Sequence, residues 1–136
     1  MDAIEARVRE GFARQPMMET FGAELLSVRE GEVRIKAPIL PLARQHLGHA
    51  HAALTFALGD TAAGFAALTV MAEGAQVVTA EIKMNLLAPG VGDYLIATGR
   101  VVKPGRRLVV VQSTVTAFDG DRERDVAILQ GTMVPV

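Results

Sequence analysis

The chain of 136 residues contains no cysteine, so disulfide bonds, thiolate metal sites and a catalytic thiol are excluded. Aromatic residues make up only 4% of the chain, so small aliphatic residues and methionine must fill the core. Basic and acidic residues nearly balance, at 14 and 15, whereas a nucleic-acid-binding domain usually carries a strong basic excess. These features indicate one globular domain, spanning residues 1–136, that binds no nucleic acid.

Three further features are missing from the chain. No uninterrupted apolar run is long enough for a membrane span, since the longest stretch, residues 50–72, carries Asp60 near its centre. Residues 1–15 are charged, unlike a secretory signal. There is also no Gly-X-Ser-X-Gly motif, which leaves a serine-hydrolase mechanism without support. We therefore expect a cytoplasmic protein that makes no contact with a membrane.

The hydrophobic pattern predicts the elements in order. Residues 2–14 have the apolar spacing of an amphipathic helix that ends at Pro16, and residues 26–37 alternate as a hairpin around Glu30-Gly31. A loop over residues 38–48 precedes a helix over about 49–72, which is nearly all apolar and so expected to be buried all round. Four strands follow, at about 78–86, 94–103, 108–118 and 124–134, and Val78, Ile82 and Leu86 share one face of the first.

This order predicts an α+β architecture in which one antiparallel sheet wraps around one long central helix. Such a sheet still has edge strands that need a cover, and side-by-side dimerisation is the simplest one. We therefore expect a homodimer, with pairing of dimers into a tetramer as an extension of it.

The central helix carries the residues of greatest chemical interest. Asp60 is a lone carboxylate in apolar surroundings, where an ionised group is costly unless a partner offsets the loss of water. It is either an acid paired with a Lys, an Arg or a backbone amide, or a functional carboxylate. The residues His51, Ala52 and Ala53 begin the helix, where free N–H groups at the positive end of the dipole suit an oxyanion. The alternative is that alanine simply starts a stable helix, capped by His49 or His51.

Ala52 and Asp60 are eight residues apart in the sequence, which is roughly 12 Å along a helix. A carbonyl group bound at the helix N-terminus is therefore out of reach of the same helix's carboxylate. If both groups act on one substrate, they come from different subunits, which antiparallel packing of two such helices would allow.

Three blocks of sequence resemble one enzyme family. The first holds Gln45, Gly48, His51-Ala52-Ala53 and Leu58-Gly59-Asp60-Thr61-Ala62, and the others are residues 78–90 and 99–106. Together they resemble the hotdog-fold acyl-CoA thioesterases of the phenylacetate-degradation type, over residues 17–134, with residues 1–15 as an added N-terminal helix. The chain departs from that family by having Ala52 and Ala53 where many members have two glycines, and by His46 and His49.

This resemblance implies a hotdog fold and hydrolysis of an acyl-CoA thioester. Asp60 is then nucleophile or general base, the N–H of Ala52 polarises the carbonyl, Gln45 hydrogen-bonds near the carbonyl or the water, and Thr79 orients the water. His51 shapes the turn, and Gly48 and Ala53 lie beside the substrate. Four basic residues either bind the phosphates of CoA or form a solvated turn: Arg100, Lys103, Arg106 and Arg107.

No metal or redox cofactor is expected. Coenzyme A is not a cofactor here, because it is part of the substrate. Three histidines, His46, His49 and His51, are close in sequence. The side chains of His49 and His51 should diverge and no second carboxylate is nearby, so capping and pocket lining are favoured over a metal site. Two other functions are compatible with the same fold. One is a hydroxyacyl-thioester dehydratase, and the other is a non-catalytic domain that binds acyl-CoA as a sensor.

Overall fold

The computed structural model describes residues 1–136. Three helices and a short 3₁₀ turn accompany six strands. In chain order they are α1 (Ala3–Ala13), α2 (Pro16–Thr20), β1 (Glu24–Arg29), β2 (Glu32–Pro38), η1 (Pro41–Ala43), α3 (Ala52–Leu68), β3 (Val77–Leu86), β4 (Tyr94–Pro104), β5 (Val109–Asp119) and β6 (Arg122–Pro135). None of the helices is long and apolar enough to cross a membrane.

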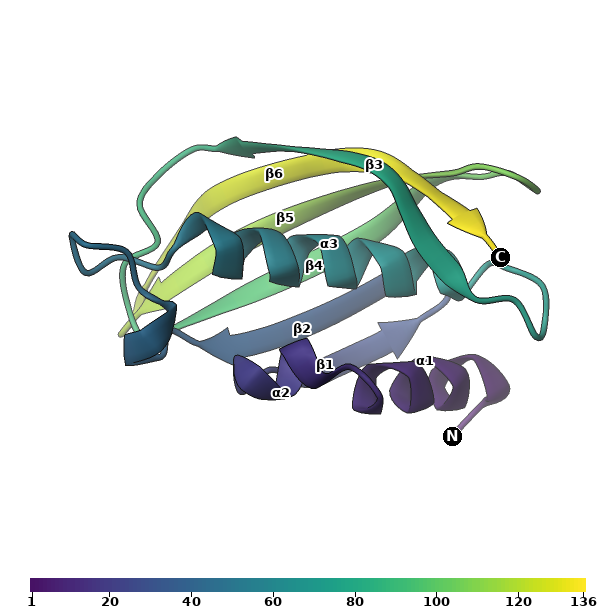
Figure 1. Ribbon diagram of the computed structural model, residues 1–136, viewed down its shortest axis with the longest axis horizontal. Helices are drawn as coiled ribbons and strands as arrows, with labels where there is room; N and C mark the ends of the chain where they lie inside the picture. The colour runs from purple at the N-terminus through teal and green to yellow at the C-terminus, as the bar shows by residue number, and fades with distance from the viewer.

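The six strands form one antiparallel sheet in the order β1-β2-β4-β5-β6-β3. The sheet curves around α3, which lies along its concave face, as Figure 1 shows. Side chains from α3, such as Leu54 and Leu58, pack with Ile35 and Leu95 from the sheet in the main core. The predicted α+β architecture, with a sheet wrapped around a long central helix, is confirmed.

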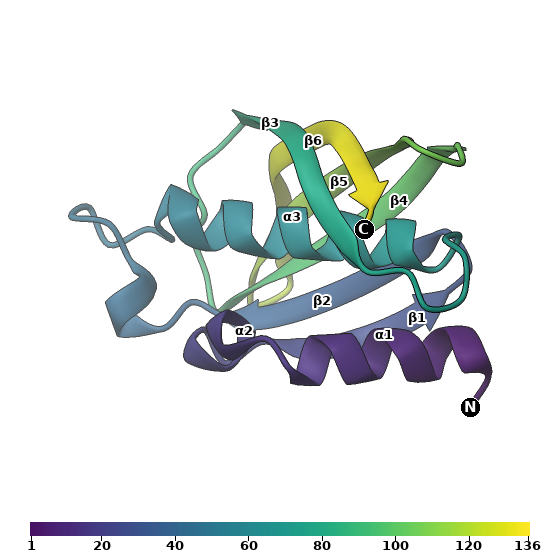
Figure 2. The same cartoon turned by 45° about the vertical axis from the view of Figure 1, so that its right-hand side comes forward.

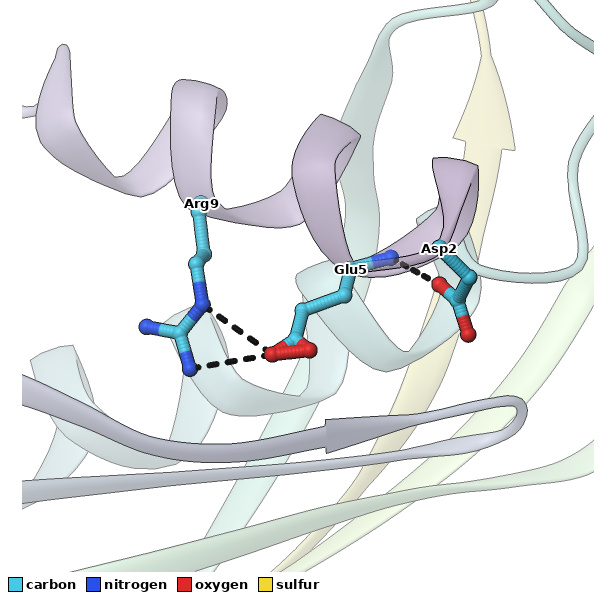
Figure 3. Close-up of polar contacts among 3 residues, drawn as sticks. All are labelled: Asp2, Glu5 and Arg9. Carbon is cyan, nitrogen blue, oxygen red and sulfur yellow. Dashed lines mark hydrogen bonds and ion pairs between the residues drawn. The ribbon is translucent and has the colours of Figure 1, made fainter.

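The N-terminal helix α1 begins at a side-chain cap. A carboxylate oxygen of Asp2 accepts a hydrogen bond from the N–H of Glu5 at 2.7 Å, and Arg9 forms an ion pair with Glu5 at 3.2 Å (Figure 3). The guanidinium of Arg7 donates to the carbonyl of Leu68 at 2.6 Å, which ties α1 to the C-terminal end of α3. The prediction that Pro16 ends α1 is correct, but Pro16 also begins α2, since proline is well suited to a first helical position.

The central helix α3 is shorter than predicted and is not buried all round. It begins at Ala52 rather than His49, because the N–H of Ala50 is held in extended backbone by the carbonyl of Gly90 at 2.9 Å. It ends at Leu68, ahead of the expected end near residue 72. One stripe stays uncovered because the sheet packs against only the opposite side. This open stripe consists of residues 52, 53, 56, 57, 60, 61 and 64, and Phe56 on it is 38% exposed.

Strand β3 also departs from the predicted alternation. Thr79 pairs with Met133 and Glu81 with Thr132, so Ala80 forms a bulge that shifts the register by one residue. Val77 therefore packs against the core together with Ile82, whereas Val78, predicted to share a face with Ile82, is 46% exposed. The bulge changes the face on which Thr79 lies, and this matters for the site.

The two edges of the sheet differ in how they are covered. Helix α1 packs along the edge strand β1, as Figure 2 shows. At the other edge, β3 pairs only with β6 and leaves its outer side unpaired. The apolar side chains Val78, Leu86 and Leu87 are exposed on and just after this strand. An unpaired edge with exposed apolar residues is the kind of surface that a protein usually covers.

Candidate functional site

Asp60 lies near the middle of α3 and faces the first half of β3. The hydroxyl of Thr79 donates a hydrogen bond to Oδ1 of Asp60 at 2.8 Å. The bulge at Ala80 makes this contact possible, because it places Thr79 on the helix side of the strand. The structure therefore brings together two residues that the sequence predicted separately as site residues.

No positive charge offsets the carboxylate of Asp60. The two ion pairs of the chain join Arg9 to Glu5 and Arg29 to Glu32, far from this position. Burial raises the pKa of Asp60 above its ordinary value, and the hydrogen bond from Thr79 opposes that rise. Within the chain no Lys, Arg or backbone amide pairs with Asp60, although the sequence left such a pairing open. The combination of burial with one hydroxyl partner is typical of a functional carboxylate.

A small cavity of about 200 Å³ opens beside this carboxylate. Its walls come from α3, from the first half of β3, from the end of β6 and from the residue before α2. The lining residues are Gln15, Asp60, Thr61, Gly64, Phe65, Val77, Val78, Thr79 and Met133. We call this space the Asp60 cavity.

The N-terminus of α3 forms a second feature. The ring nitrogen Nδ1 of His51 accepts a hydrogen bond from the N–H of Ala53 at 2.8 Å, so His51 is the helix cap. The N–H of Ala52 has no acceptor within the chain. An unpaired N–H at the positive end of a 17-residue helix is able to bind a negatively charged or polarised oxygen.

A wider cavity of about 660 Å³ lies in front of this helix end. We call it the helix-end cavity. It is lined by Gln45, His46, Leu47, His49, Ala50, His51, Ala52, Thr55, Leu86, Leu87, Ala88, Pro89 and Gly90. It shares no residue with the Asp60 cavity. Within one chain, the carboxylate and the free N–H therefore face different spaces.

The loop before α3 is organised by Gln45. Its side-chain oxygen accepts hydrogen bonds from the N–H groups of Leu47 and His49, so only its amide N–H groups remain free. Gly48 lies in this loop with φ of +90°, a conformation that favours glycine. Neither Gly48 nor Ala53 lines either cavity. Since the N–H of Ala53 is already bound to His51, the structure places both of these predicted substrate-binding residues in supporting positions.

The two remaining histidines, His46 and His49, line the helix-end cavity together with His51. No group of three His, Asp or Glu side chains in the chain comes together in a way that could hold a metal ion. His51 caps the N-terminus of α3, and the other two histidines line the cavity.

The predicted basic residues lie around the hairpin between β4 and β5. Arg100, Lys103, Arg106 and Arg107 are all exposed, and none of them forms an ion pair. This hairpin is at the end of the sheet away from the N-terminus of α3 (Figure 1). Val109, just after the turn, pairs with Met133, the residue that also pairs with Thr79. The basic turn is therefore nearer to the Asp60 cavity than to Ala52.

Several lining residues of the Asp60 cavity were not predicted. Gly64 lies four residues after Asp60, and helical spacing could have indicated it. Phe65, Met133 and Gln15 come from positions whose approach depends on how the sheet and α1 pack, and no local spacing indicates them.

Comparisons with known proteins agree with this fold. Residues 47–123 match the model of the Thioesterase superfamily. The crystal structure of a thioesterase family protein from Silicibacter pomeroyi superposes with a TM-score of 0.97 at 36% identity, covering 98% of both chains. The PaaI protein of E. coli, from the phenylacetic acid degradation operon, has a TM-score of 0.87 at 20% identity, covering 98% of this chain and 93% of its own.

A curated protein of Saccharolobus solfataricus, whose name proposes an esterase, is 29% identical over 118 residues, or 85% of this chain and 75% of its own. The superfamily match covers more than half of the chain and includes both Ala52 and Asp60. The superfamily match and the relatives named as a thioesterase family protein and an esterase support a hydrolase activity. The chain belongs to the Thioesterase superfamily and has the hotdog fold that its sequence predicts.

Proposed function

We propose that this protein hydrolyses acyl-CoA thioesters to a free acid and coenzyme A, as a thioesterase of the phenylacetate-degradation type. The observation that carries the proposal is the half-buried carboxylate of Asp60, bonded to Thr79 at 2.8 Å at the edge of a cavity. Membership of the Thioesterase superfamily supports the reaction. The motif residues Gln45, His51 and Ala52 support the narrower type.

The chemistry needs an ionised carboxylate. As a general base, Asp60 takes a proton from water while the water oxygen forms a bond to the thioester carbonyl carbon. The carbon–sulfur bond then breaks, and the departing thiolate of coenzyme A takes up that proton. As a nucleophile, Asp60 would instead attack the carbonyl carbon, break the carbon–sulfur bond and form an anhydride with the acyl group, releasing the thiolate of coenzyme A. Water then hydrolyses the anhydride to the free acid and the restored carboxylate, and the proton it gives up neutralises the thiolate. In both routes Thr79 holds the carboxylate in place, and its oxygen can accept a hydrogen bond from the water.

The developing negative charge on the carbonyl oxygen needs a donor, and the free N–H of Ala52 is suited to this role. Because Asp60 and Ala52 of one chain face different cavities, we place the Ala52 donor on a second copy. The open stripe of α3 and the unpaired β3 edge lie side by side, so one partner could cover both. The site proposed is therefore shared between the two subunits of a homodimer.

Charge and position indicate which residues would bind the rest of the substrate. Gln45 lines the helix-end cavity, and its free amide N–H groups would donate to the carbonyl or to the water. The exposed guanidiniums of Arg106 and Arg107, with Arg100 and Lys103 nearby, would bind the phosphates of coenzyme A. A carboxylate, a water molecule and a backbone N–H complete the chemistry, so the proposal requires no further cofactor.

The test is a panel of CoA thioesters with straight, branched and aryl acyl groups, assayed for release of the free thiol. Turnover of at least one of them supports the proposal. Loss of water from a 3-hydroxyacyl-CoA without release of thiol would assign a dehydratase instead. Binding of acyl-CoA without any turnover, in a folded protein, would assign a non-catalytic binding domain.

A further inference from the structure

Gly64 occupies a position in the Asp60 cavity that calls for explanation. It lies one helical turn after Asp60 on the same face of α3, and it lines the cavity together with Thr79 and Met133. It lies inside the helix, which continues to Leu68, and at such a position glycine weakens a helix relative to alanine.

Nothing within the chain requires glycine at this position. Gly64 does not have a positive φ, so alanine could adopt its backbone conformation. A Cβ built on Gly64 would meet only Sδ of Met133, at 3.9 Å, which is ordinary van der Waals contact. By contrast, a Cβ on Gly59 would lie 2.7 Å from Leu129, and one on Gly99 would lie 2.3 Å from Ala62. Packing therefore accounts for glycine at those two positions and leaves Gly64 unexplained.

Phe65 and Met133, which line this cavity together with Gly64, have little freedom to move. The side chain of Phe65 is only 5% exposed, and its ring packs on Phe12 of α1 with 6.3 Å between ring centroids. Met133 is fully buried. Because well-packed side chains resist displacement, each carbon atom added at Gly64 would be taken directly from the space beside Asp60.

We propose that Gly64 is a specificity-determining residue, and that its missing side chain leaves the space for the acyl group next to the attacking carboxylate. This inference rests on the proposed thioesterase function and adds the residue that limits acyl size. The substrate class is then an acyl-CoA whose acyl group is bulkier than acetyl and lies between α3 and β3 against Gly64.

The experiment compares the wild-type protein with Gly64→Ala and Gly64→Val, using acetyl-CoA and phenylacetyl-CoA as the small and the bulky probe. The measured quantity is the ratio of the two kcat/KM values. In a hydrophobic pocket a single extra carbon changes the discrimination between two substrates by about 10-fold or more. We therefore expect Gly64→Val to shift the ratio toward acetyl-CoA by at least that factor. Gly64→Ala should shift it in the same direction, but by less than Gly64→Val. Ala6→Val, on the exposed side of α1, adds outside both cavities the two carbons by which Val exceeds Ala, and it should leave the ratio unchanged.

Thermal melting gives a second readout. Alanine is the better helix former, so we expect Gly64→Ala to raise Tm by about 2–5 °C. A lower Tm, or loss of the oligomer seen for the wild type, would show that packing against a second copy requires the glycine, and would overturn the assignment. An unchanged ratio in variants that hydrolyse both probes would overturn this inference alone. A wild type that hydrolyses no thioester of the panel would overturn the proposed function and this inference with it.

Discussion

The hydroxyl of Thr79 and the carboxylate of Asp60 are joined by a hydrogen bond of 2.8 Å between residues 19 positions apart in the chain. The same pairing, also at 2.8 Å, occurs between Thr116 and Asp125 on the exposed surface of β5 and β6. The surface pair is thus a natural control for the site pair. It has the same chemistry, but its carboxylate is exposed, whereas the carboxylate of Asp60 is half-buried.

Asp60→Asn should lower turnover of a good thioester substrate by a factor of at least about 10², because the amide can act neither as base nor as nucleophile. The fold should survive, since a neutral amide is cheaper to bury than a charge and can still accept the hydrogen bond from Thr79. The measurement is initial rate together with thermal melting. Asp125→Asn should leave the rate unchanged. Near-normal turnover of folded Asp60→Asn would remove this residue from the mechanism.

The pH profile should report the pKa of Asp60. Because burial raises that pKa, the acidic limb of kcat/KM should lie above the range of an ordinary exposed carboxyl group, with activity rising as Asp60 ionises. Thr79→Val keeps the branched shape but removes a hydrogen bond that favours the ionised form. The limb should therefore move to still higher pH in this variant.

The control for that shift is Thr116→Val, which removes the equivalent surface hydrogen bond. Its profile should match that of the wild type. A limb that stays in place or moves to lower pH in Thr79→Val would show that the titration in the profile belongs to another group.

The basic turn can be tested with two substrates. Replacing Arg106 and Arg107 with Gln should raise KM for a CoA thioester roughly 10-fold, as expected for loss of a hydrogen bond between charged groups. A short pantetheine thioester lacks the nucleotide phosphates, so its KM should not change. Equal effects on both substrates would mean that the turn is only a solvated loop.

The shared site can be tested by complementation. Ala52→Pro deletes the proposed N–H donor. The backbone suits proline there, because Ala52 is the first helical residue and its N–H has no acceptor. His51 before it is also extended, with φ −66° and ψ 143°, as a residue before proline should be. We expect Ala52→Pro and Asp60→Asn each to be inactive alone. Heterodimers of the two hold one site with both lesions and one site with neither, so partial activity should return.

The measurement requires differently tagged subunits, co-expression and purification of the heterodimer. Both parent variants must be folded and dimeric by melting and sedimentation. If the heterodimer is then as inactive as its parents, the two groups act from the same subunit or not together, and the shared site is wrong.

Much of the fold was predictable from local pattern. The alternation of residues 26–37 and the apolar spacing of residues 2–14 indicated the hairpin and α1, because both reflect burial of one face. The apolar run around Asp60 indicated a helix inside a sheet. The predicted ends of this helix were wrong because tertiary hydrogen bonds determine where it begins and ends. One example is the hydrogen bond from the N–H of Ala50 to the carbonyl of Gly90.

The sequence by itself determined the α+β architecture, the chemical identity of the site residues and the roughly 12 Å that separates Ala52 from Asp60 on one helix, since these follow from local periodicity and fixed helical rise. Only the tertiary structure decided that the partner of Asp60 is Thr79 rather than a basic residue. It also decided that Gly64, Phe65 and Met133 surround that carboxylate. The reason is the bulge at Ala80, which turns Thr79 toward α3 and depends on the pairing of β3 with β6, a contact between segments distant in the chain.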